Sequence, residues 1–328
     1  MQLSSLHLYQ YCFSLTNGNR RHVLLVCLQE KNGKMAWGEI APLPGWSQET
    51  VAQAIAQIKK KKKALLMATW TQVSWLDQLR HMRLLPSVSF GLESALFTLL
   101  CPIKDKVVEN SALLMGSSTE ILQLAKERLL QGFTCAKLKV SQLCFSEAEK
   151  LIHQLKKQFL LRIDVNQAWS TKESLNFFSK FSANSFDYVE EPFSKPSKLH
   201  LFPYSIAIDE SYPQQLSSKK LQSLTNLKAL IYKPTIQGGI SRFCPQLLKW
   251  IKKGGCQLVI SSSFESEVGL LHCAALAARL NLKLAIGAGT YFYLKDPVGL
   301  LRESASLFVN QEMVLPNKLL QQLVEIEM

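Results

Sequence analysis

The chain has 328 residues, 47% of them hydrophobic and 19% charged, with a formal net charge of +13. This composition supports a buried core and excludes an intrinsically disordered chain. Because residues 1–20 lack a signal-peptide pattern and no uncharged apolar run reaches about 18 residues, we expect a protein that is neither exported nor membrane-spanning.

Residues 1–100 predict an α+β unit. The segments 6–13 and 22–30 are rich in strand-favouring residues, and the turn-forming sequence TNGN separates them. A loop rich in Gly and Pro is expected at residues 37–46 (WGEIAPLPGW), and helices from residue 48 to about residue 100.

Residues 101–290 predict a barrel of alternating strands and helices. From residue 111, eight apolar runs recur at spacings of about 20 to 30 residues, each followed by a segment of helical periodicity. Parallel strands buried on both faces have this appearance. An open doubly wound sheet would carry a G-x-G-x-x-G turn after its first strand, which SALLMGSSTE lacks. The runs are SALLMG, CAKLKV, LRIDVN, DYVEEP, IAIDES, ALIYKPT, QLVISSS and LKLAIGAG.

Polar residues end most of the predicted strands, at the rim where active sites of such barrels lie. Because side chains alternate along a strand, Lys137 and Lys139 share one side and would lower each other's pKa, which suits a base. A K-x-K pattern alone is also typical of a solvent-exposed strand end. From the second strand to the seventh, the rim residues are Lys137, Lys139, Asp164, Asn166, Glu190, Glu191, Asp209, Glu210, Lys233, Ser261, Ser262 and Ser263.

Asp164, Glu190 and Asp209 come from three successive strands and predict a metal site. Carboxylates packed together repel one another unless a cation lies between them, and hard oxygen ligands favour Mg²⁺, with Mn²⁺ as a substitute. Each acid alone could equally cap the following helix. Lys233, on the sixth strand, would face Lys139 across the barrel. A carboxylate substrate between two amines and an ion suits removal of the proton next to the carboxylate, because the cations stabilise the enediolate that forms.

The motifs K-L-K, R-I-D-V-N, V-E-E-P, I-D-E-S and Y-K-P-T, in this order, resemble the muconate-lactonising branch of the enolase superfamily. The segments AWGEIAPLPGWSQET, PSVSFGLESAL and ISSSFESEVGL resemble the o-succinylbenzoate synthase family, in which the first is a mobile substrate-covering loop. The resemblance implies an α/β fold: a modified TIM barrel of the (β/α)7β type, with residues 1–100 as an α+β capping domain and residues 291–328 packing back toward it.

The resemblance also implies a lyase of menaquinone biosynthesis that uses Mg²⁺ to dehydrate 2-succinyl-6-hydroxy-2,4-cyclohexadiene-1-carboxylate to 2-succinylbenzoate. Lys139 would remove the proton and return it to the departing hydroxyl, Lys233 would stabilise the enediolate by its charge, and Lys137 would contact the carboxylate. The three acids would hold the ion. Their neighbours would orient these groups: Asn166, Glu191 and Glu210.

Other rim residues are candidates for substrate contacts through hydroxyl and backbone N–H groups: Ser261, Ser262, Ser263, Gly287 and Thr290. Ordinary loop chemistry explains the serine run equally well. Arg162 is a candidate on the same face as Asp164, and an ion pair in the barrel core explains it equally well.

Two other functions stay open. Gly238 and Gly239 after Y-K-P-T resemble N-acylamino-acid racemases and dipeptide epimerases, which would use the same site. The sequence G-A-G-T lacks the D-x-D by which epimerases grip an ammonium, and so favours a small anionic carboxylate substrate without an amine. The net charge and the lysine run 59–63 would also suit a protein that binds nucleic acid or an anionic surface.

We expect neither nucleic acid nor a membrane as a partner, because no RNA-binding signature or interleaved aromatic residues accompany the basic run. The sequence indicates no oligomeric state. Its eight cysteines are scattered and form no C-x-x-C pair, so neither a zinc site nor disulfides are expected. The expected location is the cytoplasm.

Overall fold

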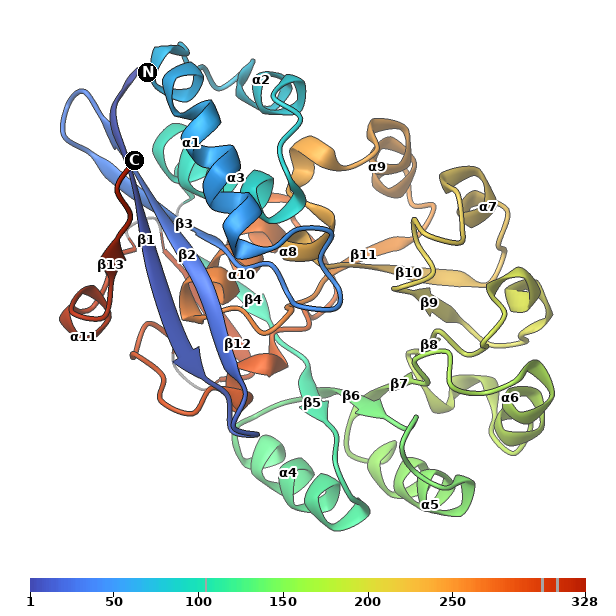
Figure 1. Cartoon of the computed structure of the whole chain (residues 1–328). Helices are drawn as coiled ribbons and strands as arrows, with labels where there is room; N and C mark the ends of the chain where they lie inside the picture. The colour runs from blue at the N-terminus through green and yellow to red at the C-terminus, as the bar shows by residue number, and fades with distance from the viewer. Residues whose placement is uncertain (104, 302–303, 311–312) are drawn as a thin grey trace.

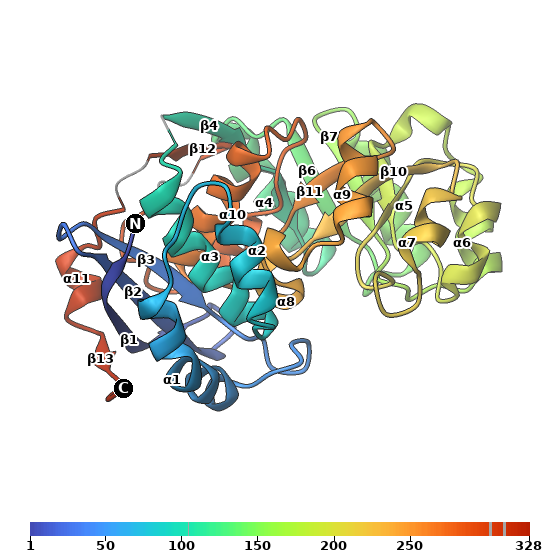
Figure 2. The ribbon, with the colours of Figure 1, turned by 90° about the horizontal axis from the view of Figure 1, so that it is seen from above.

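The computed structural model describes residues 1–103, 105–301, 304–310 and 313–328. The described residues form an antiparallel sheet with helices at one end of the molecule and a barrel of parallel strands at the other (Figure 1, Figure 2). Both termini lie beside the antiparallel sheet (Figure 1). Among the described residues, no helix combines the length and the apolar character that crossing a membrane requires.

The antiparallel sheet has the order β13-β1-β2-β3. The first two expected strands are present as β1 (Leu3–Ser14) and β2 (Arg20–Glu30). The expectation of a loop over residues 37–46 is wrong at its start, because β3 (Met35–Ile40) pairs with β2 along its whole length. The short β13 (Val324–Glu325) extends the other edge of the sheet by pairing with β1.

Three helices complete the capping domain: α1 (Val51–Met67), α2 (Trp75–His81) and α3 (Pro86–Leu100). Nearly all of α3 is buried, because it packs against β3 on one side and against the barrel on the other. The backbones of α3 and β3 come so close that a Cβ atom at Gly38 would lie 1.9 Å from the Gly91 carbonyl oxygen. Both positions therefore require glycine.

Seven parallel strands form the barrel wall in the order β11-β10-β9-β8-β7-β6-β5. The eighth predicted run provides two isolated bridges, Ile286 to Asn110 and Gly287 to Ser261, which join the two edges of this sheet. The strands are β5 (Ala112–Leu114), β6 (Cys135–Lys139), β7 (Leu160–Asp164), β8 (Tyr188–Glu190), β9 (Ile206–Ile208), β10 (Leu227–Tyr232) and β11 (Gln257–Ile260).

Helices connect the strands and surround the barrel (Figure 2). The α-helices are α4 (Ser118–Leu130), α5 (Phe145–Leu155), α6 (Thr171–Phe178), α7 (Ser218–Gln222), α8 (Pro234–Gln237), α9 (Pro245–Lys252) and α10 (Glu267–Arg279). Short 3-10 helices are η1 (Ala183–Ser185), η2 (Pro196–Leu201), η3 (Ile240–Arg242) and η4 (Gly289–Tyr293). Beyond the barrel, β4 (Lys106–Glu109) pairs with β12 (Ser306–Val309), and α11 (Asn317–Leu320) precedes β13.

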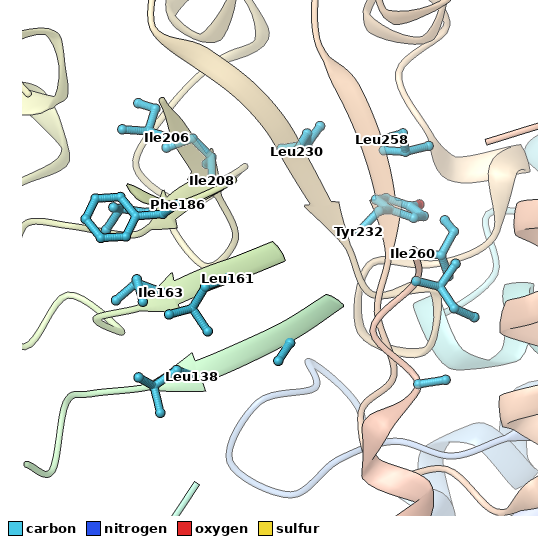
Figure 3. Packing of buried hydrophobic residues seen from close by; sticks show 14 of the residues in the cluster. Leu138, Leu161, Ile163, Phe186, Ile206, Ile208, Leu230, Tyr232, Leu258 and Ile260 are labelled. Atoms are coloured by element: carbon cyan, nitrogen blue, oxygen red, sulfur yellow. The ribbon is translucent and has the colours of Figure 1, made fainter. Parts of the chain in front are cut away.

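Apolar side chains of the strands pack with the surrounding helices in one large core (Figure 3). Leu138 and Ile163 belong to this core and are fully buried. Each such side chain stabilises the fold by about 1.5–3 kcal/mol. Because successive side chains on a strand point to opposite faces, this packing turns Lys137, Lys139 and Asp164 to the barrel interior.

Candidate functional site

The pairing register of the barrel strands places the predicted site residues in one layer. Lys139 lies opposite Asp164, and Asp164 lies opposite Glu190 on the next parallel strand. Glu190 pairs in turn with Ala207, two residues before Asp209. Backbone hydrogen bonding between β6, β7, β8 and β9 therefore determines how these side chains are spaced.

Two lysines of β6 approach the acids from one side. Lys137 Nζ lies 2.8 Å from Asp164 Oδ2 and 2.6 Å from Glu190 Oε1. Lys139 Nζ is farther from Asp164 Oδ2, at 3.9 Å. The side chain of Lys139 is 35% exposed and that of Lys137 is 18% exposed. Lys137 is therefore bound to the acids, whereas Lys139 is free to face a substrate.

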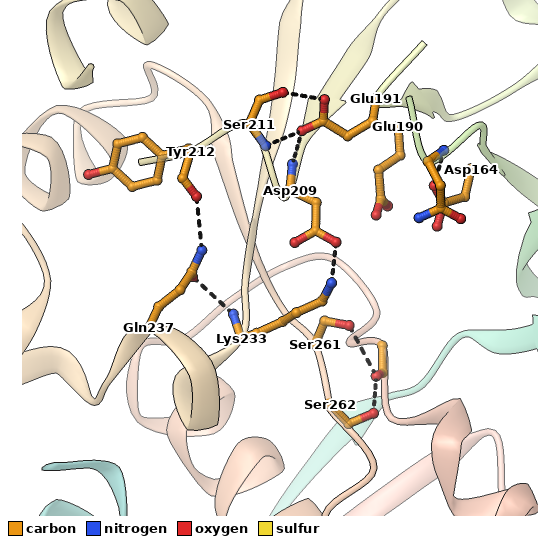
Figure 4. A network of polar contacts seen from close by, with 12 residues as sticks. Asp164, Glu190, Glu191, Asp209, Ser211, Tyr212, Lys233, Gln237, Ser261 and Ser262 are labelled. Atoms are coloured by element: carbon orange, nitrogen blue, oxygen red, sulfur yellow. Dashed lines mark hydrogen bonds and ion pairs between the residues drawn. The ribbon is translucent and has the colours of Figure 1, made fainter. Parts of the chain in front are cut away.

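Lys233 approaches the acids from the other side. Its ammonium forms an ion pair with Asp209, and Figure 4 shows the side chain extending toward this carboxylate. The indole ring of Trp46 lies 5.7 Å from Lys233 Nζ, within the range of a cation–π interaction. The structure thus places amines at the ends of β6 and β10 around the acids at the ends of β7, β8 and β9.

Burial and the charges in this cluster shift several pKa values. Burial and the carboxylate of Asp164 raise the pKa of Glu190 to about 8. Burial acts to lower the pKa of Lys137, but Asp164 and Glu190 raise it well above its ordinary value. We expected the two lysines to lower each other's pKa, and for Lys137 this expectation is wrong, because its nearest charges are carboxylates.

The chemistry of the rim carboxylates suits a divalent cation, although their spacing in this structure does not form a group of ligands among the described residues. Glu190 Oε2 and Glu210 Oε2 are buried and have no hydrogen-bond partner within the described residues. Such oxygens are costly to bury, and they are the ligands that Mg²⁺ prefers. In the described part of the chain, no three acidic, His or Cys side chains are grouped so as to hold an ion. Lys137 instead neutralises Asp164 and Glu190.

Two of the predicted orienting residues hold the acids through hydrogen bonds. Glu191 accepts them from the backbone N–H of Asp209 at 2.8 Å, and of Ser211 at 2.9 Å (Figure 4). The Asn166 N–H donates to Asp164 Oδ1 at 3.0 Å. Asn166 and Glu191 both have left-handed backbone, with φ of 48° and 45°, a strained conformation that is common at functional sites.

A cavity of about 410 Å³ opens at this end of the barrel. Its walls come from the strand ends and from the capping-domain loop that carries Leu43 and Trp46. It is large enough for a small organic acid. The predicted site residues in its lining are Lys137, Lys139, Asn166, Glu210, Lys233, Ser261, Ser262, Ser263, Gly287 and Thr290.

The hydroxyl groups in this lining are partly engaged with one another. Ser262 Oγ donates to the Gly287 carbonyl at 2.8 Å and lies 2.6 Å from Thr290 Oγ1. Ser261 Oγ reaches the same carbonyl at 3.5 Å. Ser263 Oγ is buried and has no hydrogen-bond partner within the described residues. It is thus the serine with an unused hydroxyl at the cavity.

Arg162 does not belong to the lining of this cavity among the described residues. It is 2% exposed, and its Nε donates to Asp187 Oδ2 at 2.9 Å. Its Nη1 donates to the Ala285 carbonyl at 2.8 Å, and its guanidinium lies over the ring of Tyr188. The substrate contact considered from the sequence is therefore replaced by the ion pair in the barrel core, because Arg162 lies one layer below Asp164.

Sequence reasoning missed several residues that shape the site. Trp46 lies in the recognised loop, but its contact with Lys233 is set by tertiary structure. A second cavity has a volume of about 810 Å³, and the two cavities share a wall. This wall consists of Met115, Lys139, Asn166 and Phe264. Lys139 therefore lines both cavities.

Comparison with known families gives two matches. Residues 4–99 match the family described as "MenC, N-terminal domain". Residues 120–304 match "Enolase C-terminal domain-like". The o-succinylbenzoate synthase of Vibrio cholerae is 32% identical over 298 residues, which cover 83% of this chain and 85% of that protein.

Solved structures share the fold. A MenC structure from Desulfotalea psychrophila has a TM-score of 0.73 at 20% identity and covers 94% of this chain and 100% of its own. A dipeptide epimerase from Cytophaga hutchinsonii, complexed with Mg and a dipeptide, has a TM-score of 0.81 at 17% identity and covers 99% of each chain. At these identities the likeness shows the α/β barrel with its capping domain.

Proposed function

The chain belongs to the o-succinylbenzoate synthase family of the enolase superfamily, and from this premise we propose that it dehydrates 2-succinyl-6-hydroxy-2,4-cyclohexadiene-1-carboxylate to 2-succinylbenzoate, a step of menaquinone biosynthesis. The observation that carries the proposal is the pair of amines, Lys139 and Lys233, on opposite sides of acids from three successive strands. The cavity above them is large enough for this dicarboxylate.

Asp164, Glu190 and Asp209 would hold Mg²⁺, with Mn²⁺ as a substitute. The buried, unpartnered Glu190 Oε2 supports this assignment, as does the Mg in a related structure. When bound, the ion supplies positive charge to the substrate carboxylate as the enediolate forms. Glu191 and Asn166 would keep Asp209 and Asp164 oriented through the hydrogen bonds described above.

Lys139 is the base in this proposal. Its side chain faces the cavity and has only a long contact with Asp164, so its amine is available to the substrate. Lys139 Nζ takes the proton next to the carboxylate. It then returns this proton to the hydroxyl oxygen as the C–O bond breaks, so water leaves and the ring becomes aromatic. One base on one face accounts for a syn elimination.

Lys233 and Lys137 provide fixed positive charge. Lys233, held by Asp209 and covered by Trp46, lies where it can stabilise the enediolate that follows proton removal. Lys137 keeps Asp164 and Glu190 together and lines the same cavity, so it can also contact the carboxylate of the substrate. Ser263, with its free hydroxyl, is the best placed of the three serines for a further contact.

A direct assay tests this function. Purified protein with Mg²⁺ should convert the substrate to 2-succinylbenzoate, followed by the change in ultraviolet absorbance. Exhaustive chelation should abolish the conversion, and added Mg²⁺ or Mn²⁺ should restore it. Absence of turnover with Mg²⁺, or turnover that survives removal of the metal, would contradict the proposal.

Racemisation of N-acylamino acids is the second candidate, and the same two amines favour it. One amine can accept the proton from one face of the carbon, and the other, as an ammonium, can donate a proton to the opposite face. Dipeptide epimerisation would use the same chemistry. Racemisation of N-succinylamino acids, followed by polarimetry, should be slower than dehydration if the first proposal holds. A faster racemisation would make it the main activity.

The surroundings of the enzyme can also be proposed. All eight cysteines are free in the described chain, which supports a reducing compartment such as the cytoplasm. The substrate class is a small anionic carboxylate, and the amines around the cavity provide the matching charge.

A further inference from the structure

Glu93 of the capping domain is a buried carboxylate that contacts the barrel next to the site. It lies on α3 and is 1% exposed. Its Oε1 accepts a hydrogen bond from the backbone N–H of Ile240 at 2.6 Å, and its Oε2 accepts one from Ser241 at 2.8 Å. This ionisable group in the core of the domain interface thus accepts hydrogen bonds from the backbone of one short segment, which follows β10 and α8.

The segment held by Glu93 is connected tightly to Lys233. Lys233 begins the turn after β10, and its backbone N–H donates to Gln237 Oε1 at 3.1 Å. The Tyr232 hydroxyl donates to the carbonyls of Gly238 and Gly239, at 2.7 and 3.2 Å. The start of this turn carries the catalytic amine and its end is bound by Glu93. Hydrogen bonds thus connect the two ends of this turn.

Gly239 is shaped for this contact. Its φ is −71°, which any residue can adopt. A Cβ atom there would nevertheless lie 2.3 Å from Glu93 Oε2. Gly239 therefore makes room for the carboxylate, whereas Gly238, with φ of 99°, is required by the backbone itself. The contact with Glu93 and the backbone conformation thus explain why both positions are glycine, without reference to racemase activity.

Other capping-domain groups hold the same segment. Arg80 Nε donates to the Ser241 carbonyl at 3.0 Å, and the hydroxyls of Ser89 and Ser241 lie 2.9 Å apart. The Arg242 guanidinium donates to the Leu84 carbonyl. Helices α2 and α3 thus fix the turn from outside the barrel, and Glu93 makes the contact nearest to α8.

We propose that Glu93 is a positioning residue for Lys233. Its carboxylate occupies the space left by Gly239 and holds the backbone N–H groups of Ile240 and Ser241. In this way the capping domain fixes the position of the Lys233 amine opposite Lys139. This inference rests on the proposed function in so far as Lys233 acts on the enediolate. Binding of substrate in the ground state needs Lys233 less than stabilisation of the enediolate does, so loss of positioning should reduce kcat more than it changes KM.

The first experiment compares Glu93→Gln with Glu39→Gln. Glu39 is the matched control because it is also a buried capping-domain carboxylate that accepts backbone N–H groups of the barrel, those of Ser266 and Gly269. Glu93→Gln should lower kcat per folded active site roughly 10- to 100-fold, the scale of a misplaced catalytic group, with KM changed less. A purely structural role would lower the melting temperature of both variants and leave kcat per folded site unchanged in Glu93→Gln.

A second readout does not depend on turnover. Reductive methylation of the Mg²⁺-loaded protein, quantified by mass spectrometry, measures the reactivity of Lys233 relative to Lys137. This ratio should change in Glu93→Gln and stay at the wild-type value in Glu39→Gln. If wild-type protein does not dehydrate the substrate but the ratio still changes, the function is wrong and the positioning stands. If wild-type protein is active and neither kcat nor the ratio changes, the positioning is wrong.

A double-mutant cycle isolates the contact itself. Gly239→Ala in the wild-type background should push the carboxylate aside and reproduce the loss of kcat. In a Glu93→Ala background the same substitution should have little further effect, because the atoms it would strike are absent. Equal effects of Gly239→Ala in both backgrounds would overturn the proposal, since the glycine would then serve something other than Glu93.

Discussion

Lys137 and Lys139 show at the residue scale how two neighbours on one strand acquire different roles. Both point into the barrel, as alternation along β6 predicts. Lys137 is bound between Asp164 and Glu190, whereas Lys139 is more exposed and lines both cavities. The sequence could identify both amines but not distinguish them, because the distinction depends on which carboxylates each one reaches.

Lys139→Ala should therefore lower activity strongly without unfolding the protein. We expect kcat to fall by about 10²–10⁴-fold, the typical contribution of a general base. The melting temperature should change little, because the side chain is partly exposed and its contact with Asp164 is long. Steady-state kinetics and thermal unfolding measure the two effects. Lys172→Ala, at an exposed position on α6, is the control. A variant that keeps wild-type kcat would move the base to another lysine.

At the scale of elements, buried carboxylates connect the capping domain to the barrel. Glu39, on β3, accepts hydrogen bonds from the N–H groups of Ser266 at 2.9 Å and Gly269 at 3.1 Å, at the start of α10. The N-terminus of a helix offers free N–H groups and a partial positive charge to such an acid. The sequence predicts a loop at Glu39, and a residue in a loop gives no sign of this contact.

The burial of Glu39 predicts how stability depends on pH, because it outweighs the hydrogen bonds from Ser266 and Gly269, which act to lower the pKa of this carboxyl. Burial raises the pKa of Glu39 from 4.5 to about 7, so the folded protein binds this proton more tightly than the unfolded chain does. The resulting stability is complete below about pH 4.5 and is lost as the pH rises through 7. At about 1.4 kcal/mol per pKa unit, the loss is about 3 kcal/mol.

Glu39→Gln should therefore reduce the fall in the free energy of unfolding between pH 5 and pH 8, measured by urea denaturation. Glu173→Gln is the control, because hydrogen bonds from Ser170 lower the pKa of this exposed carboxylate. An unchanged pH dependence in Glu39→Gln would show that other groups account for it.

At the scale of the whole molecule, the proposed metal site requires a complete barrel. Asp164, Glu190 and Asp209 come from three strands whose mutual register is set by the sheet, so unfolding separates them. An ion that binds only the folded state stabilises it, by about 2.7 kcal/mol when its concentration is 100 times the dissociation constant.

Mg²⁺ at millimolar concentration should accordingly raise the melting temperature of the wild-type protein. Asp164→Asn should remove this increase, because it deletes one of the three charged ligands. Asp77→Asn, at an exposed carboxylate on α2 that pairs with Arg80, should retain it. Differential scanning calorimetry measures all three. An equal increase in Asp164→Asn would place the bound ion elsewhere.

Local patterns in the amino-acid sequence predict the strands of the barrel and the residues on its rim. Apolar runs at regular spacing predicted the parallel strands, and polar residues at strand ends predicted the rim that carries Lys139, Asp164 and Glu190. These predictions hold because period-two alternation fixes which side chains face inward, and neighbouring strands bring equivalent positions together.

Contacts between residues far apart in the chain emerge from the folded structure alone. It paired Arg162 with Asp187 in the core, set Trp46 near Lys233, and joined Glu93 to backbone groups about 150 residues later. No periodicity records such contacts, because they arise when the capping domain docks on the barrel and each buried polar group must find a partner. The sequence therefore predicts the ionisable side chains of the rim, but it does not predict the hydrogen bonds and ion pairs that hold them in place.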